Sequence, residues 1–193
     1  MSMQTVELKH AYRLLNHGPT VLVGSFHAGR SNVMAAAWAM PLDFDTPKVA
    51  VVIDQSTLTR ELVDGSGFFS INVPTVAMKD QVMAVGGISG KRHPDKLTLS
   101  GVHTDLDAET GLPLVAGCVA QLVCRVLPAT AHVAGPHDLI LGEVLRAWAD
   151  ERVFSQGRWH FEDAAPELRS LHHVAGGHFY ATGEPVVARP VAT

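Results

Sequence analysis

Aromatic residues, cysteines and charges are all sparse in this sequence of 193 residues. Aromatic side chains make up 6% of the chain and charged side chains 18%, whereas hydrophobic residues make up 47%. This balance is typical of a globular protein with a core and is far from that of a disordered chain. At this length most of the unfolded surface can be buried, in one large domain or two small ones.

Long hydrophobic runs are missing as well. No stretch approaches the roughly 20 apolar residues of a membrane span, and residues 1–18 contain no apolar segment of the kind found in secretory signals. The formal net charge is -4, which argues against nucleic acid as the main partner, because phosphate neutralisation requires a basic face. We therefore expect a cytoplasmic protein with neither a membrane nor a nucleic-acid partner.

The only two cysteines are Cys118 and Cys124, in an alternating segment that indicates a strand. Six strand steps separate their Cα atoms by about 20 Å, and a disulfide requires a separation below about 7 Å. Both side chains fall on the face shared with Ala120, Leu122 and Val126. We expect buried thiols and no redox pair.

Several catalytic signatures are absent. The chain has no G-x-S-x-G elbow of serine hydrolases and no G-x-G-x-x-G after a strand. Residues 85–92, VGGISGKR, are similar to a phosphate-binding loop, but Val85 stands where its first glycine is required and Arg92 replaces the Ser or Thr. Eleven histidines are present, yet without H-E-x-x-H, C-x-x-C or H-x-H spacing, so the sequence gives little support to a metal site.

The remaining pattern predicts a mainly β protein with short helices. No repeat or linker divides the chain, so a single domain over 1–193 is expected, with its barrel at about 19–181. The polar segment 89–96 and the tail from 157 onward are expected to be loops. Strands are expected at 20–26, 48–54, 68–73, 118–127, 130–135 and 137–151, and helices at 11–18, 56–67 and 76–87.

The stretch from Ser31 to Met40, SNVMAAAWAM, fits two structures. As a helix it would be capped by Ser31 or Asn32 and stopped by Pro41. As a strand it would form a hairpin with 20–26 through the turn HAGR. Its many small side chains would then let something flat approach the backbone. We favour the strand, in which Asn32, Met34, Ala36, Trp38 and Met40 share one face.

These residues resemble the flavin reductase-like, or flavoredoxin-type, family of FMN-binding split barrels. The resemblance runs from TVLVGSF and GRSNVMAAAWAMPLDFDTPKVAVVI through LTRELVDGSGFFSINVP, SGKRHPDK and HDLILGEV to LHHVAGGHFY, over roughly residues 10–181. It implies a six-stranded antiparallel split barrel with peripheral short helices, assembled as a homodimer. It also implies FMN near the subunit interface, with its ring along the stretch that ends at Pro41.

By this resemblance the residues at the flavin ring are Asn32, Met34, Ala36, Trp38 and Met40. From the residues alone, core packing is the favoured explanation of Trp38. The resemblance makes STLT the phosphate site through Ser56, Thr57 and Thr59, where free N–H groups and the helix dipole favour an anion. Ordinary N-capping explains the same hydroxyls.

The loop SGKRHPDK supplies further candidates for the phosphate. By the resemblance a lysine near its end contacts the phosphate, and Lys96 matches better than Lys91, although the loop is longer here by a residue or two. His137 matches a histidine near the flavin, and Phe179 an aromatic at the cofactor. A solvated loop and ordinary structural roles are the alternatives.

The resemblance implies an FMN-dependent oxidoreductase, a flavin reductase that uses NADH or NADPH. The electron acceptor would be free flavin, a partner monooxygenase or a metal complex. No catalytic side chain is expected, because the flavin carries the chemistry. A non-enzymatic FMN electron carrier and a metal-binding β-barrel are the alternatives.

Overall fold

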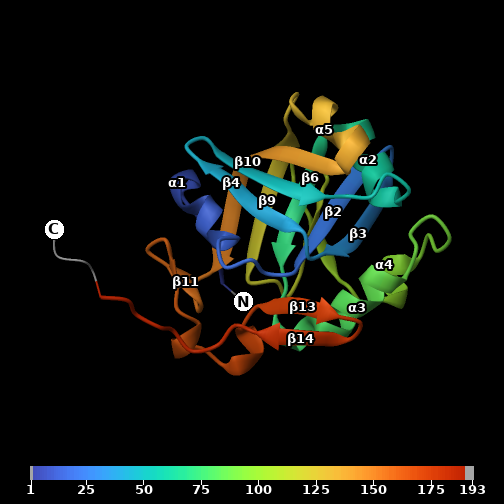
Figure 1. The fold of residues 1–193 in the computed structure, drawn as a ribbon. Coiled ribbons are helices and arrows are strands. Elements are labelled where there is room, and N and C mark those ends of the chain that lie inside the picture. The colour runs from blue at the N-terminus through green and yellow to red at the C-terminus, as the bar shows by residue number, and fades with distance from the viewer. Residues whose placement is uncertain (1, 190–193) are drawn as a thin grey trace.

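The computed structural model describes residues 2–189. Its main sheet has eight antiparallel strands, seven of them paired in the order β3-β2-β6-β9-β10-β5-β4, with β1 added along β10. The sheet curves into a barrel, and the helices lie around its outside (Figure 1). These strands are β1 Met3–Thr5, β2 Val21–His27, β3 Arg30–Ala36, β4 Ala39–Phe44, β5 Pro47–Val52, β6 Phe68–Val73, β9 Ala120–Val126 and β10 Leu139–Asp150.

The remaining elements are short. Three two-stranded sheets are formed by β7 Thr104–Leu106 with β8 Pro113–Val115, β11 Phe154–Ser155 with β12 Arg158–Trp159, and β13 Leu171–Ala175 with β14 His178–Ala181. The α-helices are α1 Leu8–Ala11, α2 Leu58–Ser66, α3 Lys79–Gly87, α4 Lys96–Leu99 and α5 Thr130–His137. The 3₁₀ helices are η1 Tyr12–Leu14, η2 Val76–Met78, η3 Phe161–Asp163 and η4 Pro166–Leu168.

Strand alternation builds two hydrophobic clusters. On β2, Val21 and Val23 belong to the barrel interior, together with Phe69 and Ile71 of β6. Leu22, between them, belongs to a second cluster. That second cluster also holds Val33 of β3 and the α3 residues Val82 and Val85. The fold is therefore a mainly β antiparallel barrel with peripheral short helices, as expected.

The stretch 31–40 is extended, as favoured, but it forms two strands instead of one. β3 pairs with β2 and β4 pairs with β5, at opposite ends of the pairing order. The chain must pass from one end to the other, and it breaks its strand geometry at Ala37 and Trp38. The expected common face for residues 32–40 is therefore wrong beyond Ala36.

Other local expectations are wrong as well. The helix expected at 11–18 begins earlier and is shorter, because α1 covers Leu8–Ala11, the 3₁₀ helix η1 covers Tyr12–Leu14 and a turn follows. Segment 130–135 is part of helix α5 and not a strand. Its alanines favour the helix, because alanine is the best helix former. The Thr130 hydroxyl exchanges hydrogen bonds of 3.0 Å with the backbone of Leu141, which fastens this helix to β10. The tail is not only loop: β13 and β14 form a hairpin that lies beside α3 and α4 in Figure 1.

Both cysteines are buried free thiols, as predicted. The common strand face expected for them is wrong, however, because β9 begins only at Ala120. Cys124 lies on β9 in the barrel interior, whereas Cys118 precedes β9 and packs in the second cluster beside Met78. Burial raises the pKa of both thiols well above the ordinary value, so neither is a reactive thiolate.

Candidate functional site

Three adjoining pockets follow β3 along the outside of the barrel. We name them by their walls: the helix-start pocket at α2, about 240 Å³, the loop pocket at 90–98, about 400 Å³, and the hairpin pocket beside β13–β14, about 370 Å³. The helix-start and loop pockets share Asn32, Leu58, Gly90 and Lys96. The helix-start and hairpin pockets share Ala35, Gly86 and Gly87. Shared walls make them one groove.

Asn32 joins β3 to the first turn of α2. Its buried side-chain amide donates a hydrogen bond of 2.7 Å to the Thr59 hydroxyl. A Cβ at Gly90 would stand 2.6 Å from Asn32 Oδ1 and 2.9 Å from Leu58 Cδ2. The loop after α3 can therefore pass over this junction only because residue 90 is glycine.

The start of α2 offers free donors to the helix-start pocket. Thr57 is the N-cap, and its hydroxyl accepts the Arg60 N–H at 3.1 Å. Thr57 therefore has the capping role that was its alternative explanation. The N–H groups of Leu58 and Thr59, in the first two helical positions, have no partner within the helix. Together with the Ser56 side chain at the pocket wall, they favour an anion.

Lys96 brings a positive charge to the same place. It opens α4, lines both the helix-start and loop pockets and is only 4% exposed. Burial lowers the pKa of Lys96 to about 8. None of the ion pairs among residues 2–189 involves Lys96. A buried cation without a carboxylate partner at a pocket wall is suited to an anionic ligand.

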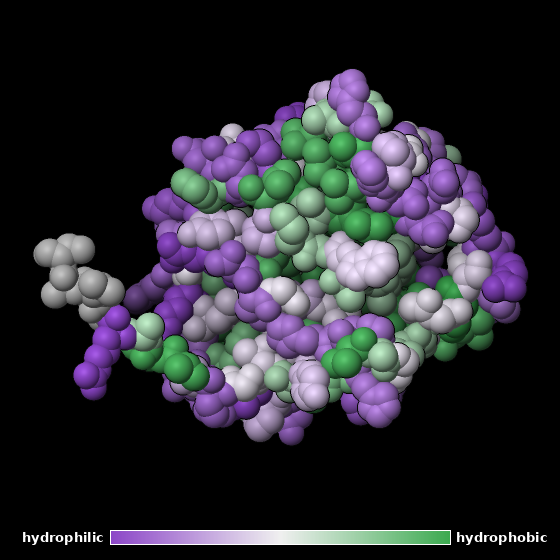
Figure 2. All heavy atoms as spheres, viewed as in Figure 1, coloured by the Kyte–Doolittle hydropathy of each residue, from purple (hydrophilic) through white to green (hydrophobic). Residues whose placement is uncertain are grey.

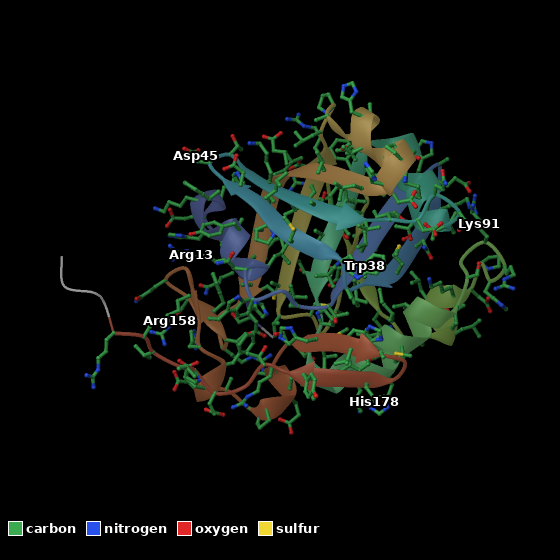
Figure 3. The ribbon with its side chains drawn as sticks, in the orientation of Figure 1. Arg13, Trp38, Asp45, Lys91, Arg158 and His178 are labelled. Carbon is green, nitrogen blue, oxygen red and sulfur yellow. The ribbon has the colours of Figure 1, made fainter. Side chains whose placement is uncertain are left out.

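Lys91 differs from Lys96 in each of these respects. It lines only the loop pocket, is exposed, and lies 3.8 Å from a Glu61 carboxylate oxygen. Figure 3 shows it on the loop that projects beyond the body of the protein. The geometry favours Lys96 over Lys91 as a ligand for a buried anion.

The part of the groove nearer the β13–β14 hairpin is lined by small and apolar side chains. Met34 lines the helix-start pocket, and Ala35, Ala36 and Ala37 line the hairpin pocket. Only β2 pairs with β3, so half of the β3 backbone N–H and C=O groups are directed away from the sheet. Phe179 completes this end, with its ring centroid 5.3 Å from that of His173.

The structure thus brings together nine of the sequence-predicted residues: Asn32, Met34, Ala36, Ser56, Thr57, Thr59, Lys91, Lys96 and Phe179. It does not place Trp38, Met40 or His137 on these walls. Trp38 is 75% exposed, which overturns its explanation as a core aromatic, and Figure 3 shows it near the beginning of β4. His137 ends α5 and is exposed.

Sequence reasoning missed some wall residues. Met83, Gly86 and Gly87 come from the end of α3, and His173 and Gly176 from the β13–β14 hairpin. The pair of glycines closing an apolar helix was a usable signal, because glycine allows a ligand to approach the backbone. Nothing local in the sequence places the hairpin against α3.

Two further findings concern the described part of the chain. Within residues 2–189, no group of three His, Cys, Asp or Glu side chains is arranged to hold a metal ion. None of the helices there is long and apolar enough to cross a membrane.

Comparison with known proteins gives consistent matches. The family model described as the flavin reductase like domain matches residues 13–169. The FMN-binding domain of a flavin reductases-like enzyme from Shewanella baltica OS155, known as a crystal structure, is 48% identical with a TM-score of 0.95, over 97% of this chain and 98% of that one. The uncharacterized protein YddH of Escherichia coli K12 is 48% identical over 95% of this chain and 96% of its own.

A shorter match is to the FMN reductase (NADH) SmoA of Agrobacterium fabrum. It is 50% identical over 46 residues, which are 22% of this chain and 25% of SmoA.

Proposed function

The chain belongs to the flavin reductase-like family, and on that premise we propose that it is an FMN-binding oxidoreductase that oxidises NADH or NADPH. The observation that carries the proposal is the groove along β3. It has a buried, unpaired cation and free helix N–H groups at one end, and small apolar residues along an edge strand at the other. FMN has the matching shape, an anionic phosphate joined by a ribityl chain to a flat ring.

Charge and hydrogen bonding favour a phosphate at the helix-start pocket. Lys96, the Ser56 and Thr59 hydroxyls and the first N–H groups of α2 surround the helix-start pocket. The fully buried Thr59 hydroxyl accepts a hydrogen bond from Asn32, and its own proton is left for a second acceptor. Charge-assisted hydrogen bonds to a phosphate are about twice as strong as neutral ones.

The small side chains along β3 favour a flat ring at the hairpin pocket. Small side chains at Ala35 and Ala36 keep the surface low beside the outward backbone groups of β3, where a flat ring could lie. A Cβ added at Gly86 would be 3.5 Å from the Ala35 Cβ, so α3 packs directly on β3 there and the ring would lie beside this contact, not between the two residues. The chemistry that FMN supplies when bound is two-electron transfer from a hydride donor. The protein's part is to bind, orient and shield the ring.

The nicotinamide is proposed to stack on the exposed face of the ring within the same hairpin pocket. Phe179 and Met83 offer further apolar surface there. The short match to SmoA supports NADH as a donor. The electron acceptor is proposed to be free flavin, a partner monooxygenase or a metal complex.

We also propose a homodimer formed through β4. Along this strand the alternate residues Met40, Leu42 and Phe44 are 53%, 47% and 64% exposed. In Figure 2, hydrophobic atoms gather in the part of this face where Figure 1 draws β4, β5 and β10. A large exposed apolar patch marks an interaction site, and a cyclic dimer is the commonest oligomer.

The test is a titration followed by a rate measurement. Purified protein at micromolar concentration should quench the fluorescence of added FMN, and the loaded protein should oxidise NADH or NADPH when free flavin is supplied. Absence of quenching would contradict FMN binding. Quenching without nicotinamide oxidation would instead identify a non-enzymatic FMN electron carrier.

A further inference from the structure

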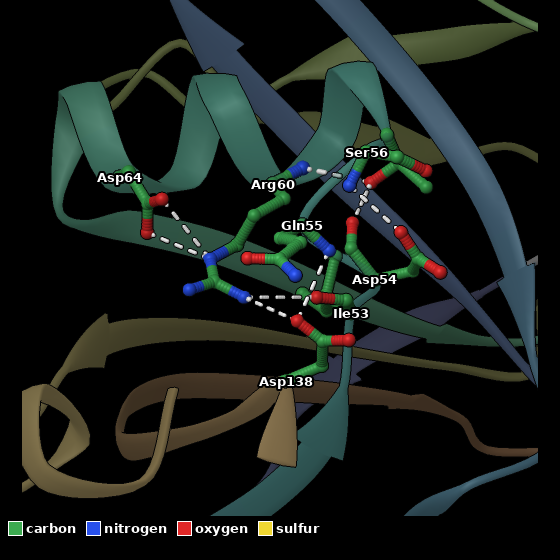
Figure 4. Close-up of polar contacts among 8 residues, drawn as sticks. Ile53, Asp54, Gln55, Ser56, Arg60, Asp64 and Asp138 are labelled. Atoms are coloured by element: carbon green, nitrogen blue, oxygen red, sulfur yellow. Dashed lines mark hydrogen bonds and ion pairs between the residues drawn. The ribbon is translucent and has the colours of Figure 1, made fainter. Parts of the chain in front are cut away.

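A buried arginine lies behind the start of α2, facing away from the groove. The Arg60 side chain is 9% exposed and lines none of the three pockets. Its Nε donates to both carboxylate oxygens of Asp64, each at 3.0 Å. Its Nη1 donates to the Ile53 carbonyl at 3.1 Å and to Asp138 Oδ1 at 3.3 Å (Figure 4).

Asp138 connects this arginine to the chain that leads into α2. It caps the end of α5 in a left-handed conformation, with φ of 54°. Its carbonyl accepts the Ile53 N–H at 2.9 Å, and its Oδ1 accepts the Gln55 N–H at 3.1 Å. Asp138 thus accepts the N–H groups of two residues, Ile53 and Gln55, in the segment that follows β5.

The segment between this anchor and the helix is held by its own polar groups. Asp54 Oδ1 accepts the Ser56 N–H at 2.7 Å, and the Asp54 carbonyl accepts the Thr57 hydroxyl at 2.8 Å. The turn 54–57 is therefore a rigid link (Figure 4). Its position depends on Asp138 and Arg60 at one end and determines where Ser56 and the first N–H groups of α2 lie.

We propose that Asp138 and Arg60 are positioning residues for the phosphate end of the groove, in an assignment that rests on the proposed FMN function. Neither touches the ligand. They fix the turn 54–57 so that its hydroxyl and the following N–H groups converge with Lys96 on one anion. Arg60 also offsets the negative charge of Asp138, which would otherwise oppose a phosphate nearby.

Because phosphate contacts alone depend on this turn, the loss should be selective. Replacing Asp138 by glycine keeps the left-handed backbone available and removes the carboxylate. Replacing it by asparagine keeps an oxygen acceptor for Gln55 and Arg60 in a residue that also tolerates this backbone. Comparing Asp138→Gly with Asp138→Asn therefore separates the hydrogen-bonded anchor from the backbone conformation.

The experiment titrates wild type and both variants with FMN and riboflavin and measures amide hydrogen exchange at Gln55 and Ser56. For Asp138→Gly we expect FMN binding weakened about tenfold, about 1.4 kcal/mol, riboflavin binding almost unchanged, and faster exchange at Gln55. Asp138→Asn should restore most of the FMN affinity and the slow exchange.

Equal weakening of both flavins by Asp138→Gly would overturn the inference, and so would unchanged FMN affinity. Either outcome leaves FMN binding by the wild type intact, so the proposed function survives. Failure of the wild type to bind FMN at all would instead contradict the proposed function, and this inference with it.

Discussion

The stretch SNVMAAAWAM contributes to both β3 and β4. The two strands nevertheless differ in exposure, because other elements cover β3 and leave one face of β4 open. β3 lies against α2, α3 and the loop at 90, and its residues Asn32 and Val33 are buried. β4 exposes every second side chain, with Phe44 touching only Tyr12 among the aromatic rings of residues 2–189, at 6.0 Å between centroids. The covered edge strand is the wall of the proposed ligand groove, whereas the uncovered apolar strand is the proposed dimer surface.

The largest effect is expected if the exposed segment from Trp38 to the end of β4 is made polar. Replacing both Trp38 and Phe44 by serine removes two large exposed apolar side chains from each protomer. Central aromatics at interfaces contribute about 2 kcal/mol or more each, and a two-fold interface uses every residue twice. We expect the dimer dissociation constant to rise by at least about a thousandfold, measured by sedimentation velocity.

Tyr180→Ser is the matched control for that change, because Tyr180 is equally exposed but lies on β14. It should leave the association state as it is. A wild-type protein that sediments as a stable monomer of 20.7 kDa with FMN bound would disprove the role assigned to β4.

On the β3 side, the largest effect is expected at the buried cation. Lys96→Ala removes charge-assisted hydrogen bonds worth roughly 1.5–3 kcal/mol, so FMN binding should weaken about ten- to a hundredfold. Riboflavin, which lacks the phosphate, should bind almost as before. Fluorescence titration with both flavins measures the difference.

Lys91→Ala is the control for Lys96→Ala, because Lys91 is exposed and already lies near Glu61. If Lys91→Ala selectively weakened FMN and Lys96→Ala did not, the phosphate would be held by the outer lysine. If neither variant separated FMN from riboflavin, the start of α2 alone would hold the phosphate.

The apolar half of the groove should respond without such selectivity. Ala35→Leu adds bulk where the helix-start and hairpin pockets meet. Overfilling a packed site costs about 1–3 kcal/mol, so FMN and riboflavin should both weaken by about tenfold or more, as measured by equilibrium titration. Ala77→Leu, at an exposed position of η2, is the control. A loss confined to FMN would show that the ring does not lie along β3.

The smallest effect is a pH dependence of FMN affinity. The pKa of Lys96 is lowered to about 8 by burial, and a bound phosphate favours the charged ammonium. Affinity is therefore full below about pH 8 and falls above it by up to about tenfold per pH unit, until the pKa of the complex is reached. Isothermal titration between about pH 7 and about pH 9.5 keeps the phosphate a dianion, because its second pKa is about 6.

The pH dependence has its own internal control. Riboflavin binding should stay flat over the same range, and Lys96→Ala should abolish the slope for FMN. A slope that persists in Lys96→Ala would assign the titration to another group.

The sequence by itself predicted the strands β2, β5, β6, β9 and β10, the helices expected at 56–67 and 76–87 and the buried thiols, because these follow from local periodicity, caps and burial. Its resemblance to the flavin reductase-like family supplied nine residues of the groove. Only the tertiary structure decided that SNVMAAAWAM breaks at Ala37, because each half pairs with a different strand. The tertiary structure also decided that segment 130–135 is helical, because its alternating pattern favours a strand whereas its alanines favour a helix. It likewise decided the positions of His173 and Gly176, which reach the groove through contacts between segments far apart in the sequence.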